Sequence, residues 1–551
     1  MKTHFITLLL LASLLLPSAA ASQAQTGAVA VKITPQERKI AQAITADQLR
    51  DYLYFVASDE MEGRDTPSRG LDLTAKFIAT MLSRWGFKPA GDDGTFFQRI
   101  ALSTETIDAA NSSLKIGGQT YTINNDFYRV SGSGSAEGQM VFAGHGWFVK
   151  SKNIDAYRGM DVRGKVVVLY TDGLPSQTSL TRLPDGITRN DLIGTRGVDW
   201  FDPASYARSN GAAGIILLAS PQAAERWGQI PQLFSRRGMY PEKLRADAAR
   251  AGQNSMPVFV ASQSVSDAIL AGEAGNRSTA MPFAINKSAS LTAASRAEIK
   301  WTQNVVALWE GGDPALKSEM VAIGAHYDHV GVNPNAPGPD KIWNGADDDG
   351  SGTVAVLSIA EALAKSERRP RRSVLLVWHA GEEKGLWGSE YFNKFPTVDI
   401  KNVVAQLNID MIGRSRKPDD TNAKNKDLTG ENQIYVIGAE MMSSTLGAVV
   451  KAANSGYLNM AYDYRYDDPK DPNRFFFRSD HFNYAVNGIP VAFWFDGVHE
   501  DYHQPGDHAD KIDYNKLEKV TRTIFLTLWE LTELKERPKV DKQLPPELMR
   551  R

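Results

Sequence analysis

The sequence predicts an α/β fold, a mixed and mostly parallel sheet with helices on both faces, into which a β-rich domain is inserted. From about Leu291 onward, short apolar runs alternate with helical patterns, which is typical of a sheet covered by helices. Between about Asn111 and Lys287 the pattern changes to short β-rich runs separated by irregular segments. The length of 551 residues, with 42% hydrophobic content, exceeds one ordinary domain and can fill two cores.

The apolar runs in the last part of the chain predict the strands of the main sheet. We expect them within residues 319–328, 372–380, 403–410 and 488–497, with helices at 352–364, 387–395 and 514–535. Residues 33–102 have a helical pattern, because the apolar side chains of LTAKFIATMLSRWGF recur at helical spacing and Gly86 ends the run.

The β-rich middle region predicts a second domain within the first. Its expected strands lie within residues 139–146, 164–170, 211–220 and 256–262, and a long irregular stretch covers residues 172–206. We therefore expect the main domain at residues 25–110 and 288–551, and the inserted domain at residues 111–287.

The N-terminus reads as a secretory signal peptide at residues 1–24. Lys2 is followed by an almost unbroken apolar segment, residues 5–16, and then by Pro17 and three alanines, with cleavage expected after Ala21 or Ala24. The alternative is an uncleaved anchor, but the apolar run is short against the roughly 20 residues that a membrane helix needs. We expect a secreted or periplasmic protein that is free of the membrane after cleavage.

Charge and cysteine content exclude several classes of function. With 62 Lys and Arg against 64 Asp and Glu, the chain has no basic excess for nucleic acid and no long basic run for a membrane surface. The absence of cysteine excludes disulfides, thiolate metal sites and a cysteine nucleophile. Any bound metal must therefore be held by histidine and carboxylate side chains.

Histidine and acidic residues follow several of the predicted strands. In open α/β sheets, ligands bind at the carboxyl ends of the strands. The residues expected at that edge form five segments, which are HYDH at 326–329, NGADDDGSG at 344–352, HAGEE at 379–383, Asp410, and EDYH at 500–503. Such a concentration is hard to explain by solvation alone and favours a metal site.

Taken singly, most of these segments have a simpler explanation. An acidic glycine-flanked loop is usually a turn or a calcium-type loop, and a glutamate pair after a strand is more often a charge at a helix start. His326 and Asp328 are more informative, because alternation along a strand puts both on one face, where the carboxylate can orient a metal-bound imidazole. The His-Glu-x-x-His helix of other zinc peptidases is absent.

The motifs resemble those of metallopeptidase family twenty-eight, the co-catalytic dinuclear zinc aminopeptidases. The matching pieces occur in order over residues 304–513 and read GAHYDHVG, NGADDDGSG, HAGEEKGLWGS, LNIDMIG, RSDHFNYAVNGIP and EDYHQPGD. VASDEMEGRDTPSRG is similar to the N-terminal region of that family. The middle block, with YRGMDVRGKVVVLY and ARSNGAAGIILLAS, resembles a protease-associated domain. The resemblance implies the zinc-exopeptidase fold.

The resemblance also implies a site for two Zn²⁺ ions per chain. His326 and Asp410 would hold one ion, Glu383 and His503 the other, and Asp348 would bridge both. Histidine and carboxylate ligands also accept manganese or cobalt, so other divalent metals stay open.

Three further residues take catalytic roles from the same resemblance. Glu382 would be the general base, Asp328 would orient His326, and Tyr502 would be a donor to the transition state. The resemblance also implies a cis peptide bond between Asp348 and Asp349. His379 receives no role.

We therefore expect an aminopeptidase that removes N-terminal residues from peptides through a metal-bridging water activated by Glu382. A carboxypeptidase or dipeptidase of the same fold is the first alternative. It needs a basic clamp for a substrate carboxylate, for which Arg414, Arg465 and Arg478 are candidates. Glutaminyl cyclisation at a single zinc and a non-catalytic binding module are further alternatives, which the complete ligand set argues against. The sequence leaves the preferred N-terminal residue and the oligomeric state open.

Overall fold

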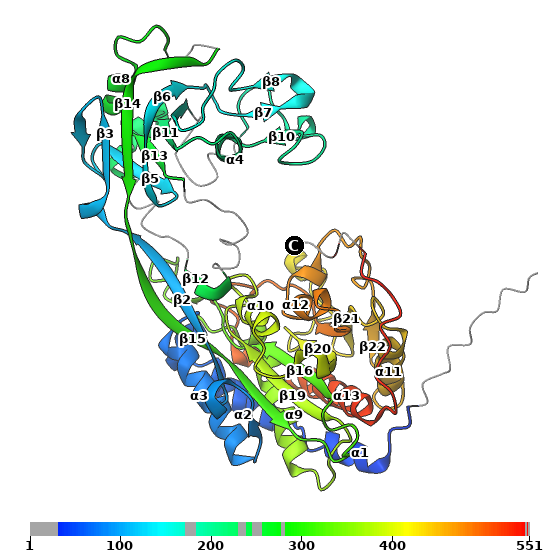
Figure 1. The fold of residues 1–551 in the computed structure, drawn as a ribbon. Helices are drawn as coiled ribbons and strands as arrows, with labels where there is room; N and C mark the ends of the chain where they lie inside the picture. The colour runs from blue at the N-terminus through cyan, green and yellow to red at the C-terminus, as the bar shows by residue number, and fades with distance from the viewer. Residues whose placement is uncertain are drawn as a thin grey trace, which may run out of the picture.

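The computed structural model describes residues 31–170, 183–229, 239–244, 256–276, 281–545 and 548. The expected signal peptide at residues 1–24 lies outside this range. The described chain carries two large sheets, connected by a long ribbon of the strands β2 (Phe97–Ile107) and β15 (Ser295–Trp309) (Figure 1). No helix among the described residues is both long and apolar enough to cross a membrane.

The main sheet is mixed, with parallel strands at its centre. Four neighbouring strands run parallel, namely β19 (Ser373–His379), β16 (Met320–His326), β20 (Val403–Ile409) and β23 (Val491–Phe495). Antiparallel pairs flank them, through β15 and β2 on one side and β21 (Gln433–Ile437) on the other. The short strands β12 (Tyr240–Pro241), β22 (Ala461–Asp463) and β1 (Lys88–Pro89) complete the sheet.

The strand order creates a switch point at β16. The next two parallel strands of the chain pair with opposite sides of β16, since β19 lies on one side and β20 on the other. Connections that leave a strand in opposite directions open a crevice beyond its carboxyl end. The carboxyl end of β16 is His326.

Helices cover both faces of the main sheet, as expected. Alternate residues of β15, β16 and β19 enter two separate apolar clusters, so each strand is buried on both sides. One face packs against α1 (Pro35–Ala41), α2 (Ala46–Val56), α3 (Arg69–Arg84), α9 (Gly352–Lys365), α11 (Ser444–Ser455) and α13 (Tyr514–Glu533). The other face packs against α10 (Trp387–Lys394) and α12 (His481–Val486).

The smaller sheet is formed by the middle of the chain. Its strands, in spatial order, are β4 (Gln119–Tyr121), β3 (Ser113–Ile116), β14 (Phe283–Ala293), β6 (Gly134–Phe142), β9 (Val166–Tyr170), β11 (Gly214–Leu218), β13 (Val258–Ala261) and β5 (Phe127–Ser131). The helices α4 (Pro203–Ser209), α5 (Pro221–Glu225) and α8 (Gln263–Leu270) belong to the same region, as does a small sheet of β7 (Phe148–Val149), β8 (Ile154–Asp155) and β10 (Trp200–Phe201).

The structure corrects the helical interpretation of residues 97–102. They are the start of β2, where Gln98, Ile100 and Leu102 are buried. This spacing has the period of a strand, and the whole of β2 pairs with β15. In addition, the boundary expected after residue 287 falls inside β14, which stays in the smaller sheet up to Ala293.

One short segment of the middle region returns to the main sheet. Residues 239–244, here called the return segment, include β12, which pairs with β2 at Leu102 and Ser103. Leu244 of the return segment is 2% exposed and joins an apolar cluster with Ile100, Leu102, Trp387 and Tyr391. The return segment thereby contacts α10, the helix that follows the two predicted glutamates.

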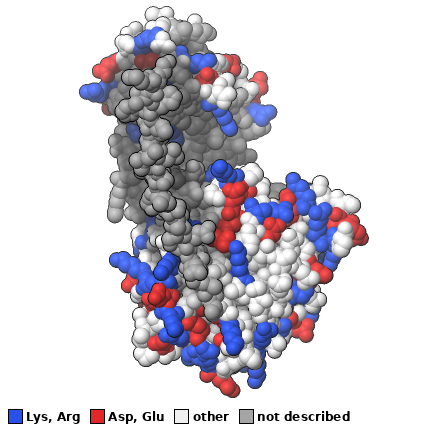
Figure 2. Space-filling view, turned by 90° about the vertical axis from the view of Figure 1, so that its right-hand side faces the viewer, with Lys and Arg blue, Asp and Glu red and all other residues white. Residues whose placement is uncertain are grey.

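Charge on the surface is mixed in sign. On the face seen in Figure 2, basic and acidic side chains of the described residues are interspersed over the main domain. This distribution agrees with the near-zero net charge of −2 for the whole chain.

Candidate metal centre

Three parallel strands bring predicted residues to one edge of the main sheet. His326 ends β16 and is 1% exposed, and Asp410 directly follows β20. Glu382 and Glu383 follow β19 after a turn at Gly381. Gly381 has a φ of 74°, and an added Cβ would lie 3.1 Å from the ring of Trp387, so this turn favours glycine.

The acidic loop between β16 and β19 supplies Asp348. This residue lies in Ala346–Ser351, just before α9, and the Asp348–Asp349 peptide bond is cis, as expected. At Gly345, where φ is 58°, a Cβ would approach within 2.3 Å of the Asp348 carbonyl and 2.5 Å of the His329 ring. Only glycine fits this position without displacing either neighbour.

The neighbours of Asp348 in the loop have structural contacts instead. Asp347 Oδ1 accepts a hydrogen bond from Gly413 N at 2.7 Å, and Asp349 Oδ1 accepts one from Met411 N at 3.1 Å. Ser351 Oγ accepts one from Ile412 N at 3.0 Å. The loop is thus fastened to the chain just after β20, and Asp348 alone of the three aspartates is directed at the predicted ligands.

Two groups of side chains at this edge have the spacing of metal ligands, and they share Asp348. The first group is His326, Asp348 and Asp410, whose ligand atoms lie within 4.8 Å of one another. His326 Nε2 is 3.3 Å from Asp348 Oδ1 and 3.6 Å from Asp410 Oδ1.

The second group contains His503, Asp348, Glu383 and a residue that was not predicted, His329. His503 Nε2 is 3.1 Å from Asp348 Oδ2 and 3.0 Å from Glu383 Oε2, while His329 Nδ1 is 2.9 Å from Glu383 Oε1. The only sequence signal for His329 is its place three residues after His326.

The donors in these groups fit a pair of divalent cations. Among the described residues, His326 Nε2, Asp348 Oδ2 and Glu383 Oε1 are buried and make no hydrogen bond of good geometry, although other atoms of the same two groups lie 2.9 to 3.3 Å away. Leaving buried polar atoms unsatisfied costs about 1–3 kcal/mol each, and cations would satisfy all three. Nitrogen and carboxylate oxygen donors suit zinc.

The close approach of acidic groups and histidine rings shifts the pKa values of both. Burial lowers the pKa of His503, but the carboxylates of Asp348 and Glu383 outweigh burial and raise it to about 10. For Asp348, burial raises the pKa, but the adjacent rings of His326 and His503 outweigh burial and hold it well below its ordinary value.

Glu382 lies beside both groups and belongs to neither. Its Oε2 is 4.0 Å from His326 Nε2, and its side chain is 12% exposed. Burial raises the pKa of Glu382 well above its ordinary value, and the charges of Glu383 and Asp410 add to this effect against His326. Such a carboxyl can accept a proton at neutral pH.

Asp328 bridges three parts of the site. Its Oδ1 accepts a hydrogen bond from Glu382 N at 3.2 Å, and its Oδ2 accepts one from the Thr66 hydroxyl at 3.0 Å. The Asp328 carboxylate is 3.7 Å from His326 Nδ1, farther than its own carbonyl oxygen at 3.1 Å. Asp328 therefore faces the Nδ1 side of His326, which leaves Nε2 directed at the other ligands.

A pocket adjoins the centre. Its polar wall is formed by Asp348, Glu382 and Asp410, and the rest is lined by Met411, Phe475, Arg478, Phe493, Phe495, Val498 and Tyr502. Tyr502 stacks on His503 with ring centroids 4.0 Å apart, and its hydroxyl accepts a hydrogen bond from Arg478 at 3.3 Å. Burial raises the pKa of Tyr502, so its hydroxyl stays protonated at neutral pH.

The three arginines considered as carboxylate clamps occupy different places. Arg414 is buried in an ion pair with Asp501 at 2.9 Å, and Arg465 pairs with Asp463 at 2.7 Å. Arg478 alone of the three lines the pocket. His379, which had no predicted role, is buried in the core with its Nε2 3.2 Å from the hydroxyl of Tyr484.

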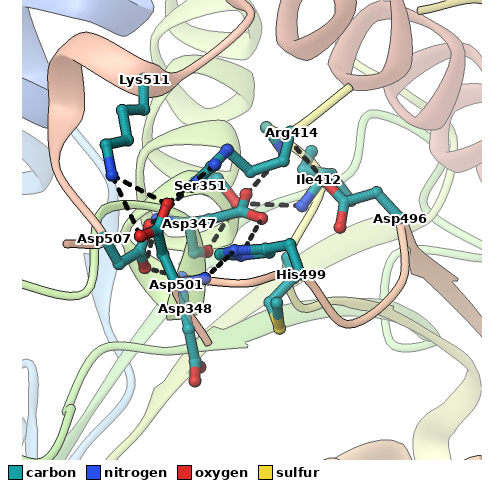
Figure 3. A network of polar contacts seen from close by, with 12 residues as sticks. Asp347, Asp348, Ser351, Ile412, Arg414, Asp496, His499, Asp501, Asp507 and Lys511 are labelled. Atoms are coloured by element: carbon teal, nitrogen blue, oxygen red, sulfur yellow. Dashed lines mark hydrogen bonds and ion pairs between the residues drawn. The ribbon is translucent and has the colours of Figure 1, made fainter. Parts of the chain in front are cut away.

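A buried polar network supports the acidic loop from behind, and Asp348 points away from it (Figure 3). Asp507 accepts hydrogen bonds from the backbone N–H of Asp347 at 3.0 Å and of Asp348 at 3.1 Å. His499 Nε2 is 3.3 Å from Asp347 Oδ2. This network joins the loop to the segment that carries His503, a connection that the sequence did not predict.

Comparison with known proteins bears on the same part of the chain. Residues 304–528 match the model of peptidase family M28. Residues 304–528 are here called the M28 region. The M28 region contains every residue of the two groups described above.

Curated relatives match over less than half of the chain. A probable leucine aminopeptidase of Arthroderma otae is 28% identical over 248 residues, which are 43% of this chain and 60% of that protein. A probable zinc metalloprotease of Leptosphaeria maculans is 29% identical over 269 residues, 43% of this chain and 58% of that protein. The chain thus spans about three fifths of the length of these relatives.

Solved structures match over a longer span at lower identity. An aminopeptidase from Aneurinibacillus sp. strain AM-1 is 16% identical with a TM-score of 0.45, covering 92% of this chain and 97% of its own. A zinc aminopeptidase from Bacillus subtilis is also 16% identical, with a TM-score of 0.44 and coverages of 92% and 99%.

Proposed function

We propose that this protein is a zinc-dependent aminopeptidase that hydrolyses N-terminal residues from peptides. The observation that carries the proposal is the pair of histidine and carboxylate groups that share Asp348, with Glu382 beside them. The match of residues 304–528 to the model of peptidase family M28 supports it, as do relatives named leucine aminopeptidase and zinc metalloprotease.

In this proposal, the ligands divide into two sets. His326 and Asp410 would hold one ion, Glu383 and His503 would hold the other, and Asp348 would contribute to both sets. His329 is close enough to join the second set or to orient Glu383. When bound, a pair of divalent ions supplies an acidified water and a Lewis acid for the scissile carbonyl.

The remaining residues move and hold protons. The Glu382 carboxylate takes a proton from the attacking water and passes it to the leaving amine. Asp328 keeps the imidazole of His326 turned with Nε2 toward the centre. The Tyr502 hydroxyl receives a hydrogen bond from Arg478 and so has its own proton free to donate to a developing oxyanion.

We also propose roles for two regions outside this site, the N-terminus and the middle region. Residues 1–24 are a signal peptide, which makes the protein secreted or periplasmic, and the middle region is a protease-associated domain that supplies no metal ligand. N-terminal sequencing of protein from a periplasmic or culture fraction tests the first claim, since an intact Met1 would contradict it.

A carboxypeptidase or dipeptidase activity is the second candidate, because Arg478 lines the pocket and could bind a substrate carboxylate. One screen separates the two. Aminoacyl-nitroanilides, N-acetylated peptides and free dipeptides are offered before and after treatment with a chelator.

The aminopeptidase proposal expects cleavage of the nitroanilides and none of the N-acetylated peptides. It also expects loss of activity with the chelator and recovery with Zn²⁺. Cleavage of N-acetylated peptides from their carboxyl ends would favour the carboxypeptidase, and cleavage restricted to dipeptides would favour the dipeptidase. Metal analysis of the purified protein gives the number of ions per chain.

A further inference from the structure

The side chain of Arg64 is fully buried directly behind the metal centre. Arg64 ends η1 (Asp59–Arg64), within the EGRDT motif of the N-terminal region. It therefore belongs to a segment outside the M28 match and carries none of the ligands proposed above.

The Arg64 guanidinium donates to backbone carbonyls of both ligand-bearing segments. Nε donates to Tyr327 O at 2.9 Å, one residue after His326. Nη1 donates to Asn344 O at 2.7 Å and Nη2 to Gly345 O at 2.8 Å, immediately before the loop that contains Asp348. A fourth bond, from Nη1 to Val56 O at 2.8 Å, fixes the guanidinium to the end of α2.

The backbone of the same segment is also close to these loops. Arg64 O accepts a hydrogen bond from His329 N at 3.1 Å, and the Thr66 hydroxyl donates to Asp328 at 3.0 Å. A Cβ at Gly63, where φ is 61°, would lie 2.4 Å from the carbonyl oxygen of Trp343. The segment therefore packs closely against the end of β16 and the start of the acidic loop, with no space for an added methyl group at Gly63.

Burying the charged guanidinium of Arg64 costs free energy, so we look for what its fixed hydrogen-bond directions contribute. Among the described residues, Arg64 forms no ion pair. Burying a charge without a direct partner of opposite charge is unfavourable. Burial lowers the pKa of Arg64 to about 10, against the charges of Asp328, Asp507, Asp348 and Asp349, so it stays charged at neutral pH. A planar guanidinium can reach several carbonyls in fixed directions, which a lysine ammonium cannot.

We propose that Arg64, assisted by Thr66, is a positioning residue for the metal centre. By holding the carbonyls of Tyr327, Asn344 and Gly345 on one planar group, it sets the separation between His326 and Asp348 and thereby the affinity for metal. The inference rests on the proposed function only in requiring that the centre binds a divalent metal.

The test compares Arg64→Lys with Arg372→Lys. Arg372 is a matched control because it is equally buried and donates to Glu319 Oε2 at 2.7 Å and to Leu534 O, outside both ligand groups. Apparent Zn²⁺ affinity is measured on the full chain by competition with a chelating dye, and Co²⁺ absorption spectra report ligand geometry. Melting temperature of the metal-free protein reports general stability.

Both variants should lower the melting temperature. Arg64→Lys should also weaken Zn²⁺ binding by about 10–100-fold, the usual effect of removing a group that orients metal ligands, and should change the Co²⁺ spectrum. Arg372→Lys should leave affinity and spectrum unchanged. If Arg64→Lys binds Zn²⁺ like the unmodified protein, or if Arg372→Lys weakens binding equally, the proposal is wrong.

Thr66→Val keeps the test decisive if Arg64→Lys does not fold. It removes only the hydroxyl that contacts Asp328 and should weaken Zn²⁺ binding several-fold with little effect on folding; unchanged affinity would overturn the proposal. These measurements need no substrate. An unmodified protein that binds Zn²⁺ but cleaves no peptide would therefore refute the proposed function and leave this inference standing.

Discussion

At the scale of single residues, the adjacent glutamates Glu382 and Glu383 have different contacts. The carboxylate of Glu383 lies against His329 and His503, whereas that of Glu382 lies 4.0 Å from His326. A difference of one position after the turn at Gly381 thus separates a proposed ligand from a proposed base.

Substituting these glutamates should have different consequences. Glu382→Gln should retain both metals and lower kcat by about 10²–10⁴-fold, because an amide keeps the size of the side chain but cannot accept the proton. Glu383→Gln should lower metal content together with activity. Metal analysis and steady-state kinetics on an aminoacyl-nitroanilide distinguish them, with Glu390→Gln on α10 as control. Loss of metal from Glu382→Gln would reverse the two assignments.

Asp507 should support the centre without contacting metal. Its carboxylate accepts the backbone N–H groups of Asp347 and Asp348, so Asp507→Ala leaves two buried donors unsatisfied. We expect a loss of about 2–4 kcal/mol in the free energy of unfolding and a lower affinity for Zn²⁺. Urea unfolding and dye competition measure these, and the exposed Asp510 provides the control variant Asp510→Ala. Stability equal to that of the control would contradict the assigned role of Asp507.

The residues proposed as ligands could be predicted because each follows an apolar strand or a glycine-flanked loop in a recognisable motif. His329 was missed because the motif explains the site without it, and only the fold shows its ring beside Glu383. Arg64 and Asp507 were missed for a different reason. Apart from Val56, the backbone carbonyls and amides that their side chains contact are more than a hundred residues away along the chain, and such contacts leave no pattern in the sequence.

At the scale of elements, the three helices expected after residue 350 are present, whereas α11 and α12 of the same domain were not expected. The helix expected at residues 514–535 is α13, which runs from Tyr514 to Glu533, and that expected at 352–364 is α9. The strands β16, β19, β20 and β23 also lie within the expected runs. The strand β2 was assigned wrongly, because it alternates buried and exposed residues over a short span that follows a helical pattern.

Glu530 near the end of α13 should make stability depend on pH. Burial, together with the charges of Glu37 and Glu533 and against Arg368, raises the pKa of Glu530 from 4.5 to about 7. The folded protein therefore keeps a proton that the unfolded chain loses, and this contribution to stability falls as pH rises from about 4.5 to about 7.

Glu530→Gln removes that dependence. Relative to the unmodified protein, its free energy of unfolding should increase with pH across this window by about 1 kcal/mol, after allowance for solvent screening. Urea unfolding of metal-free protein between pH 4.5 and 8 measures the difference. Glu536→Gln, at an exposed position after α13, is the control. A difference that shrinks as pH rises would refute the argument.

At the scale of the whole molecule, the described residues form two connections between the smaller sheet and the main one. The first is the covalent ribbon of β2 and β15, and the second is the return segment, which packs Leu244 against Trp387 and Ile100. The change to short β-rich runs in the middle of the sequence predicted an inserted domain. The sequence could not predict the return segment, because six residues with one buried leucine carry no distinctive pattern.

Loosening the return segment should affect α10. Leu244→Ser removes a side chain that is 2% exposed and should cost about 2–4 kcal/mol locally. We expect faster hydrogen exchange of the α10 amides, Trp387–Lys394, since they lose the contact that covers Trp387. The neighbouring exposed residue gives the control Glu242→Ser. Unchanged exchange in α10 would show that the return segment does not stabilise this helix.

The ribbon has a consequence for how the two sheets depend on each other. Ile107 and Ser295 are partners in the same antiparallel ladder, so the chain leaves the ribbon and comes back to it one strand spacing apart, about 5 Å. In the topology of the main sheet, everything between these two residues except the return segment is therefore the connection of a β-hairpin. Such a connection needs its two ends close together, which is the condition under which one domain can be inserted into another.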